Sequence, residues 1–234
     1  MKAPVLLIPG LLCSAEVFAP QVPALWSVGP VMVASTLQGR TIEEIASTIL
    51  QDAPPRFALA GISFGGYVCM EIMRRAPERV TRLALLDTSA RPDTPEQSER
   101  RREMLAQARK ADFAPWVEEA LTSIMHPSRH ADAGLRAVNR RMGLAVGVDG
   151  LARQIDAAID RIDSRESLSA VQVPTLVLVG EEDRLIPPEH SREIARIVPD
   201  AEMLVIPDCG HSSTLEQPAL VTSALLLWMQ RQMA

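Results

Sequence analysis

Short apolar runs alternate along the chain with stretches in which apolar residues recur every three or four positions. The apolar runs lack the regular alternation of apolar and polar residues that marks a half-exposed strand. Strands that are apolar on both faces are typical of a parallel sheet covered by helices on both sides. The pattern predicts six strands, at residues 3–10, 30–36, 56–63, 80–89, 174–183 and 201–208.

Helical spacing follows several of these strands. Thr41 and Glu44 are placed as a capping box, and Pro54 stops the helix that they begin. A second helix starts directly after Ser63 and is ended by Pro77. Helices are expected at residues 41–52, 64–77, 188–198 and 217–233. Together the two patterns predict an α/β fold with a doubly wound, mostly parallel six-stranded sheet.

Residues 91–167 interrupt this rhythm. They contain a charged helical segment followed by three more segments with helical apolar spacing, and no strand pattern. A purely helical stretch between two strands of a parallel sheet is typical of an insertion that covers the core. We therefore expect an α/β core formed by residues 1–90 and 168–234, with residues 91–167 inserted as a helical cap.

Composition narrows the class of protein. The 234 residues, 47% of them hydrophobic and 23% charged, suit one globular domain with an insertion. A net charge of −5 and only 3% aromatic residues argue against nucleic-acid binding. No apolar run approaches the ~18 residues of a membrane span. The three cysteines form no C-x-x-C, and the N-terminus lacks a secretory pattern, so a cytoplasmic protein is expected. A periplasmic protein with its signal removed would look the same.

Residues 61–65 read Gly-Ile-Ser-Phe-Gly where a predicted strand gives way to a helix. A serine on such a sharp turn lies in a strained conformation that lifts its hydroxyl above the sheet, and the flanking glycines avoid collisions across the turn. The alternative is a serine that only begins the helix in a glycine-rich turn. Because the motif falls between a buried strand and a buried helix, Ser63 is the candidate nucleophile.

A serine hydroxyl needs a base, and the chain has four histidines. His126 and His130 have helical metal-ligand spacing, but Pro127 disrupts that helix, so no metal site is predicted. His190 lies in a charged helix and is expected to be solvated. His211 follows the last strand, at the sheet edge where Ser63 also lies, and is the candidate base. Its alternative role is to begin the final helix.

The base needs a carboxylate to orient it. Asp183 follows the fifth strand at its carboxyl end and is preferred over Asp87, which follows the fourth. The order Ser63, Asp183, His211 is the one that G-x-S-x-G hydrolases use.

Two backbone N–H groups are expected to form an oxyanion hole. Phe64, the residue after the nucleophile, supplies one, and Leu11 in the turn after the first strand supplies the other, with Gly10 letting the chain turn. The alternative for residues 9–13 is a plain turn.

These residues resemble the α/β-hydrolase superfamily, and more narrowly its small bacterial carboxylesterases, the group that contains the pimeloyl-[acyl-carrier-protein] methyl ester esterases. The matching segments span almost the whole core: residues 6–18, 59–88, 173–188 and 206–218. Two departures matter. Pro9 stands where many relatives have histidine, and the chain begins at the strand that is third in the family. The resemblance therefore implies a sheet that lacks the first two strands and has an exposed edge, which a partner subunit in a homodimer would cover.

The expected function is hydrolysis of a small or medium carboxylic ester through an acyl-serine intermediate, without cofactor or metal. The partner is then a small-molecule ester, with no nucleic acid and no membrane. Apolar residues of the helical cap pack it against the core, and some are expected to line the acyl pocket: Trp116, Leu121, Met125 and Met142. Cys13 and Cys209 flank the site and are interpreted as small buried hydrophobic residues.

Two other classes of function stay open at this point. The same three residues also serve C–C bond hydrolysis, thioester hydrolysis and cofactor-free peroxidation. A ligand-binding protein that kept the fold but not the chemistry is the second alternative, although binding alone does not need all three residues.

Overall fold

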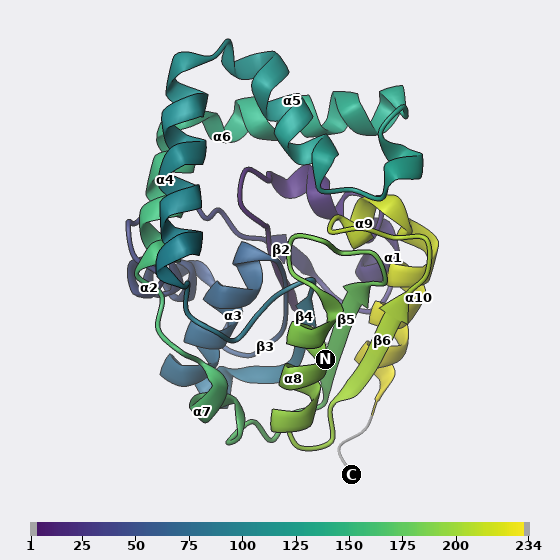
Figure 1. Cartoon of the computed structure of the whole chain (residues 1–234). Coiled ribbons are helices and arrows are strands. Elements are labelled where there is room, and N and C mark those ends of the chain that lie inside the picture. The colour runs from purple at the N-terminus through teal and green to yellow at the C-terminus, as the bar shows by residue number, and fades with distance from the viewer. Residues whose placement is uncertain (1–3, 232–234) are drawn as a thin grey trace.

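The computed structural model describes residues 4–231, which form one α/β unit with a helical layer above it (Figure 1). Its sheet has six strands in the order β2-β1-β3-β4-β5-β6, and every pair is parallel. This confirms the predicted fold class. The strands are β1 (Val5–Ile8), β2 (Val31–Val33), β3 (Phe57–Ile62), β4 (Val80–Leu86), β5 (Thr175–Gly180) and β6 (Glu202–Ile206).

Successive residues of the central strands enter two separate cores, because side chains alternate across a sheet. Leu7 belongs to a core shared with α1 (Val22–Trp26) and α10 (Pro218–Gln230), and Leu6 to one shared with α2, α3 and α8. The bounds of the last three are Ile42–Asp52, Phe64–Arg75 and Pro188–Ile197. Helices thus cover both faces of the sheet, as the doubly wound pattern predicts.

The edge strands depart from the prediction of burial on both faces. Every residue of β2 is only half-buried, and β6 alternates exposed and half-buried residues before it ends at the buried Ile206. An edge strand lacks a neighbour on one side, so helices cover it incompletely. β2 is also shorter than the expected 30–36. A partner subunit on either edge stays a prediction.

The predicted helix boundaries hold to within a few residues. α3 ends at Arg75, and Pro77 begins a short 3₁₀-helix, η2 (Pro77–Arg79). The final helix, predicted at residues 217–233, is α10, and a short helix that was not predicted, α9 (Ser213–Glu216), precedes it. Residues 3, 232 and 233, which belong to predicted elements, lie outside the described residues. No helix in residues 4–231 is both long enough and apolar enough to span a bilayer.

Four helices connect β4 to β5, in the segment predicted to be the helical cap. They are α4 (Pro95–Lys110), α5 (Phe113–Ser123), α6 (Ala133–Ile159) and α7 (Arg165–Leu168). η3 (Pro127–Arg129) joins α5 to α6, and η1 (Ala15–Phe18) lies below α5 and α6 in Figure 1. α4, α5 and α6 stand above one end of the sheet in Figure 1. Gly147 kinks α6, since its φ of 68° is in the left-handed region that favours glycine.

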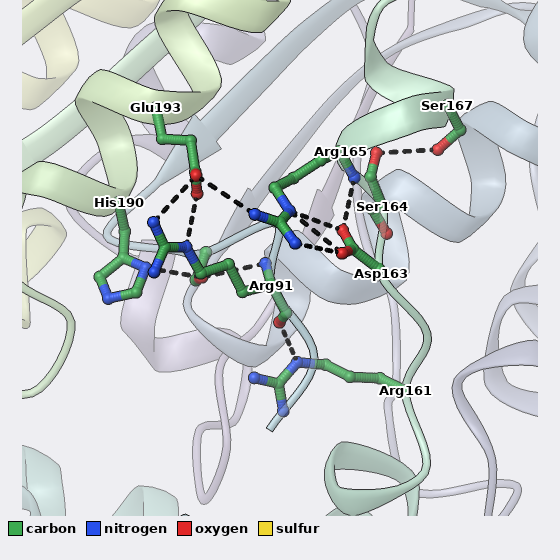
Figure 2. A network of polar contacts seen from close by, with 9 residues as sticks. Arg91, Arg161, Asp163, Ser164, Arg165, Ser167, His190 and Glu193 are labelled. Atoms are coloured by element: carbon green, nitrogen blue, oxygen red, sulfur yellow. Dashed lines mark hydrogen bonds and ion pairs between the residues drawn. The ribbon is translucent and has the colours of Figure 1, made fainter. Parts of the chain in front are cut away.

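An arginine-rich network joins the two ends of this insertion where it leaves the core (Figure 2). Arg91, just after β4, donates to both carboxylate oxygens of Glu193 on α8, at 2.8 and 2.9 Å. Arg165, near the exit, approaches the same Glu193 at 3.5 Å. Arg161 donates to the Arg91 carbonyl (3.0 Å) and pairs with the buried Asp93 (2.5 Å). The entry and exit of the helical cap are therefore held together and against α8.

Candidate active site

Ser63 lies on a strained turn between β3 and α3. Its φ of 54° and ψ of −117° are unfavourable for a residue with a side chain. Two hydrogen bonds support the turn: the Ser63 N–H donates to the Leu86 carbonyl, and the Thr88 hydroxyl donates to the Ser63 carbonyl, each at 2.8 Å. The strain is thus held by β4, and it leaves the serine hydroxyl half-exposed above the sheet edge.

The glycines on either side are required by close backbone approach. A Cβ on Gly61 would lie 2.5 Å from the Gly65 carbonyl oxygen, and a Cβ on Gly65 would collide with the Ile8 carbonyl. Real Cβ atoms do not come this near to backbone atoms, so either substitution would force the turn open. This is the physical reason for the spacing of the motif.

His211 reaches Ser63 from the loop between β6 and α9. Its Nε2 lies 2.8 Å from the Ser63 Oγ, and its Nδ1 lies 2.7 Å from the Asp183 Oδ2. With the Asp183 carboxyl oxygen as acceptor, Nδ1 carries the proton that it donates, and Nε2 accepts from the serine hydroxyl. The His211 N–H donates to the Ile124 carbonyl at the end of α5 (3.0 Å), so the helical cap helps to place the loop.

Asp183 is fixed by the turn that follows β5. Its Oδ1 accepts hydrogen bonds from the Leu185 and Ile186 N–H groups, each at 2.9 Å, which leaves Oδ2 for His211. The structure therefore brings together the three side chains that the sequence selected. Burial lowers the pKa of His211, but the charge and hydrogen bond of Asp183 outweigh it, so the pKa is raised above its ordinary value of 6.5.

Asp87, the rival carboxylate, does not contact His211. It is fully buried, accepts from the Gly180 N–H (2.9 Å) and hydrogen-bonds with the Ser213 hydroxyl. Burial and then the charge of Asp183 raise its pKa from 3.8 to about 8, against weaker opposing effects of His211 and its hydrogen bonds. Asp87 is therefore mostly protonated at neutral pH, and its place in the site is structural.

Glu216 organises the histidine loop and was missed by the sequence reasoning. Its buried carboxylate accepts from the N–H groups of Gly210 (3.0 Å) and Ser212 (2.9 Å), on either side of His211. It also accepts from the His126 N–H in the helical cap (2.7 Å). The only signal in the sequence is a glutamate five positions after His211, in a helix too short to have a recognisable pattern.

The turn after β1 lies beside the nucleophile, as expected for an oxyanion loop. A Cβ on Gly10 would stand 3.5 Å from the Ser63 Cβ. The tight backbone, however, is at Leu12, whose φ is 60°, and not at Gly10. The Leu12 N–H donates to Gln154, whereas within residues 4–231 the N–H groups of Leu11 and Phe64 make no hydrogen bond. Both predicted donors thus remain available.

A cavity of about 200 Å³ opens between this turn, the loop after β2 and the kink of α6. Most of the residues that line it are small or apolar: Pro9, Cys13, Ser14, Ala15, Val33, Ala34, Ser35, Thr36, Leu37, Ala145 and Val146. The cavity is close to Ser63, because the Cβ position of Gly10 lies 3.5 Å from both the Cys13 Sγ and the Ser63 Cβ. It has room for a small apolar group.

The apolar residues predicted to line an acyl pocket are packed elsewhere. Leu121, Met125 and Met142 are buried in the core that joins the helical cap to the sheet, and Trp116 stacks on Phe113 with ring centroids 5.8 Å apart. None of these four lines the 200 Å³ cavity. Their part in binding a substrate stays a prediction.

The remaining histidines each have a local hydrogen-bond partner. His126 contacts the Ser128 hydroxyl (2.7 Å), His130 the Met125 carbonyl (3.0 Å), and His190 the Ser89 hydroxyl (2.9 Å). His190 is half-buried rather than solvated, and burial lowers its pKa. Across residues 4–231, His, Cys, Asp and Glu side chains form no group of three or more that could hold a metal ion.

Burial also raises the pKa of two cysteine thiols near the site. The pKa of Cys13 rises to about 12 and that of Cys209 rises well above its ordinary value. Neither is a thiolate at neutral pH, so neither is an activated nucleophile.

A serine, a histidine and a carboxylate that are hydrogen-bonded in this order at the carboxyl edge of a parallel sheet are typical of a hydrolase site. Comparison with known families agrees: the model of the alpha/beta hydrolase fold matches residues 53–218. The chain therefore belongs to the alpha/beta hydrolase fold family.

Three similar proteins illustrate the range of that family. A thermophilic esterase from Thermogutta terrifontis is 30% identical, with a TM-score of 0.86 over 97% of this chain and 89% of its own. A pimeloyl-[acyl-carrier protein] methyl ester esterase from Aromatoleum aromaticum is 27% identical over 77% of each chain. The dihydrolipoyllysine-residue acetyltransferase component of an acetoin cleaving system from Pseudomonas putida is 28% identical over 205 residues. This chain spans only about half (53%) of that last protein.

Proposed function

We propose that the protein is a serine esterase that hydrolyses a carboxylic ester through an acyl intermediate on Ser63. The observation that carries the proposal is the unbroken hydrogen-bonded chain from Ser63 through His211 to Asp183, at 2.8 and 2.7 Å. The relatives named as esterases support the same reaction class.

The proposed reaction has two halves. The Ser63 Oγ attacks the ester carbonyl while its proton moves to the His211 Nε2, and the carbonyl oxygen becomes an oxyanion held by the Leu11 and Phe64 N–H groups. The C–O bond to the alcohol then breaks, and His211 returns the proton to the leaving oxygen. Water, deprotonated by His211, attacks the acyl-serine in the same way and releases the acid. Asp183 keeps the imidazole in the required tautomer and stabilises its charged form.

The size of the cavity beside Ser63 favours a substrate with a small acyl or alcohol group. Its volume of about 200 Å³ is below the ~300 Å³ at which pockets for drug-sized ligands begin. A long acyl chain would need a further opening among the apolar residues that join the helical cap to the core. The proposed substrate is therefore a small or medium ester.

A chain-length series of p-nitrophenyl esters, from acetate to decanoate, tests this function. We expect kcat/KM to be highest for the shorter esters and to fall by several orders of magnitude in Ser63→Ala. Ser123→Ala, an exposed serine of α5, is the matched control and should behave as wild type. A Ser63→Ala variant that keeps a tenth of the activity would refute the assignment.

Other reactions on the same three residues are separated by substrate. Names of further relatives propose a non-heme bromoperoxidase and a carbamate hydrolase, at 28% identity each. Acyl thioesters, β-diketones, carbamates and a halide-plus-peroxide assay would therefore be run beside the ester series. If one of these is turned over faster than every ester, that reaction replaces ester hydrolysis. Failure of all of them, together with no labelling by a fluorophosphonate, would favour a ligand-binding protein.

A further inference from the structure

One buried glutamine of the helical cap reaches into the predicted oxyanion loop. The Gln154 side chain, on the last two turns of α6, is completely buried. Its Oε1 accepts the Leu12 N–H at 3.0 Å, and its Nε2 donates to the Thr36 hydroxyl at 2.9 Å. A single amide thus connects three segments that are far apart in sequence: the turn after β1, the loop after β2 and α6.

The second half of α6 is shaped to bring this side chain down. Gly150 lies one turn before Gln154 on the same helix face, and a Cβ there would stand 3.1 Å from the Leu37 side chain. The absence of a Cβ therefore lets the helix approach the loop after β2. Arg153 then anchors it by donating to the Leu37 carbonyl at 2.9 Å.

The hydrogen bond to Gln154 is made at Leu12, the residue of the turn after β1 that has a left-handed backbone. Leu12 has a φ of 60°, a conformation that is unfavourable for a residue with a side chain. Its N–H is buried, and it would be unpaired without Gln154. Fixing the peptide between Leu11 and Leu12 also limits rotation at Leu11, whose own N–H is the proposed oxyanion donor.

We propose that Gln154 is a positioning residue for the oxyanion hole, which it stabilises by clamping the Leu11–Leu12 peptide. The inference rests on the proposed serine-hydrolase function and deepens it. It also answers how the loop is braced in a chain that has Pro9 before Gly10: the support comes from the helical cap instead of from a side chain of the loop.

The first test compares Gln154→Met with wild type on the preferred p-nitrophenyl ester. Methionine keeps the length of the side chain and removes both hydrogen bonds. We expect kcat to fall by about 10–100-fold with KM changed by less than about threefold, since losing an oxyanion donor outright costs ~10²–10³-fold. Gln154→Glu keeps an acceptor for the Leu12 N–H and should retain more activity. Thr36→Val, which frees only one end of the clamp, should lose about 2–5-fold.

A second readout separates positioning from general loss of structure. A trifluoromethyl ketone adds to Ser63 as a tetrahedral oxyanion, whereas the matching methyl ketone binds mainly without adding. In Gln154→Met the inhibition constant of the first should rise by about the same factor as kcat falls, and that of the second should stay within about twofold. Gln107→Met, an exposed glutamine of α4, is the control for substitution in the helical cap.

The outcomes distinguish this inference from the proposed function. A Gln154→Met variant with kcat within twofold of wild type, or with unchanged affinity for the trifluoromethyl ketone despite a lower kcat, overturns the role of Gln154. If wild type is labelled at Ser63 by a fluorophosphonate but hydrolyses no ester, only the ester function fails. The role of Gln154 is then decided by labelling: slower labelling of Gln154→Met than of wild type supports it, and equal rates overturn it. If wild type is not labelled, both fail.

Discussion

Two aspartates at the ends of neighbouring strands have opposite roles in this site. Asp87 follows β4 and Asp183 follows β5; their exposed fractions are 0% and 2%, so burial does not separate them. What differs is the partner of each carboxylate. Asp183 accepts from two backbone N–H groups and from His211, whereas Asp87 contacts the Gly180 N–H and the Ser213 hydroxyl.

In the proposed mechanism, the carboxyl group after β5 takes part in the chemistry and the one after β4 supports the structure. Two negative charges so near each other in a buried site are unfavourable, so one group gives up its charge. Asp183 has a histidine partner at 2.7 Å, and Asp87 has none. Asp87 is left mostly neutral, with its pKa raised to about 8 by burial and by Asp183. The position of the His211 loop therefore determines which of the two aspartates contacts the histidine.

The strongest test of this comparison is Asp183→Asn. The Leu185 and Ile186 N–H groups keep the amide oxygen, so the amide NH2 faces His211 Nδ1 and can only donate to it. The imidazole then loses its required tautomer, and kcat should fall by ~10⁴-fold. Steady-state kinetics on the preferred ester measures it. Asp52→Asn, an exposed aspartate of α2, is the matched control. A loss of less than tenfold would mean that Asp87 takes over, and the contrast between the two carboxyls would be lost.

Asp87→Ala should affect stability more than chemistry. It leaves the buried Gly180 N–H without a partner, which costs about 1–3 kcal/mol of unfolding free energy. Urea unfolding followed by circular dichroism measures this loss, and kcat at neutral pH should drop less than about tenfold. A far larger drop in kcat with unchanged stability would place Asp87 in the reaction.

Asp87→Asn should change how stability depends on pH. The folded protein holds the Asp87 proton up to a pKa of about 8, whereas an unfolded aspartate loses it near 3.8. The folded state therefore binds more protons between these values, and this group's contribution to stability is lost as pH rises through them. Asparagine resembles the protonated acid, so the midpoint temperature of thermal unfolding should fall less steeply from pH 4 to 8 in Asp87→Asn than in wild type. An identical slope in both proteins contradicts a raised pKa.

The smallest expected effect is on the pH profile of activity. His211 must be neutral to act as a base, so kcat/KM should fall as pH drops through its pKa. Because that pKa is raised, the midpoint for wild type should lie above 6.5. Asp87 is uncharged over most of this range, so Asp87→Asn should shift the midpoint only slightly downward. A midpoint well below 6.5 would show that Asp183 does not stabilise the imidazolium.

The sequence was sufficient for the fold class and for the side chains that meet, because each lies at a recognisable junction. Ser63 follows β3 directly, Asp183 and His211 lie in the loops after β5 and β6, and the carboxyl ends of parallel strands share one edge. Residues that act through other residues had no such signal. Gln154 is one more polar residue on a helix, and Glu216 lies in a single short turn, until the tertiary fold places each beside backbone N–H groups.

Local departures also depend on tertiary packing. Helical spacing in residues 133–159 predicts two helical segments but not the kink at Gly147, and the turn after β1 is made at Leu12 although Gly10 was the expected residue. At Leu12 a contact from the distant Gln154 stabilises a conformation that the local sequence does not prefer. The same reasoning accounts for the half-exposed β6, whose apolar sequence gave no indication that it would be an edge.

The two ends of the inserted helices meet directly. The Ser164 N–H donates to the Ala90 carbonyl at 2.9 Å. The chain therefore leaves the core after β4 and returns to it before β5 at one place. Domain insertions are tolerated where the chain leaves and re-enters a core at one place. The junction is thus suited to exchange, and evolution or a protein engineer can lengthen, shorten or replace the helical cap, provided that the new segment keeps the contacts that place the His211 loop and the Leu12 turn.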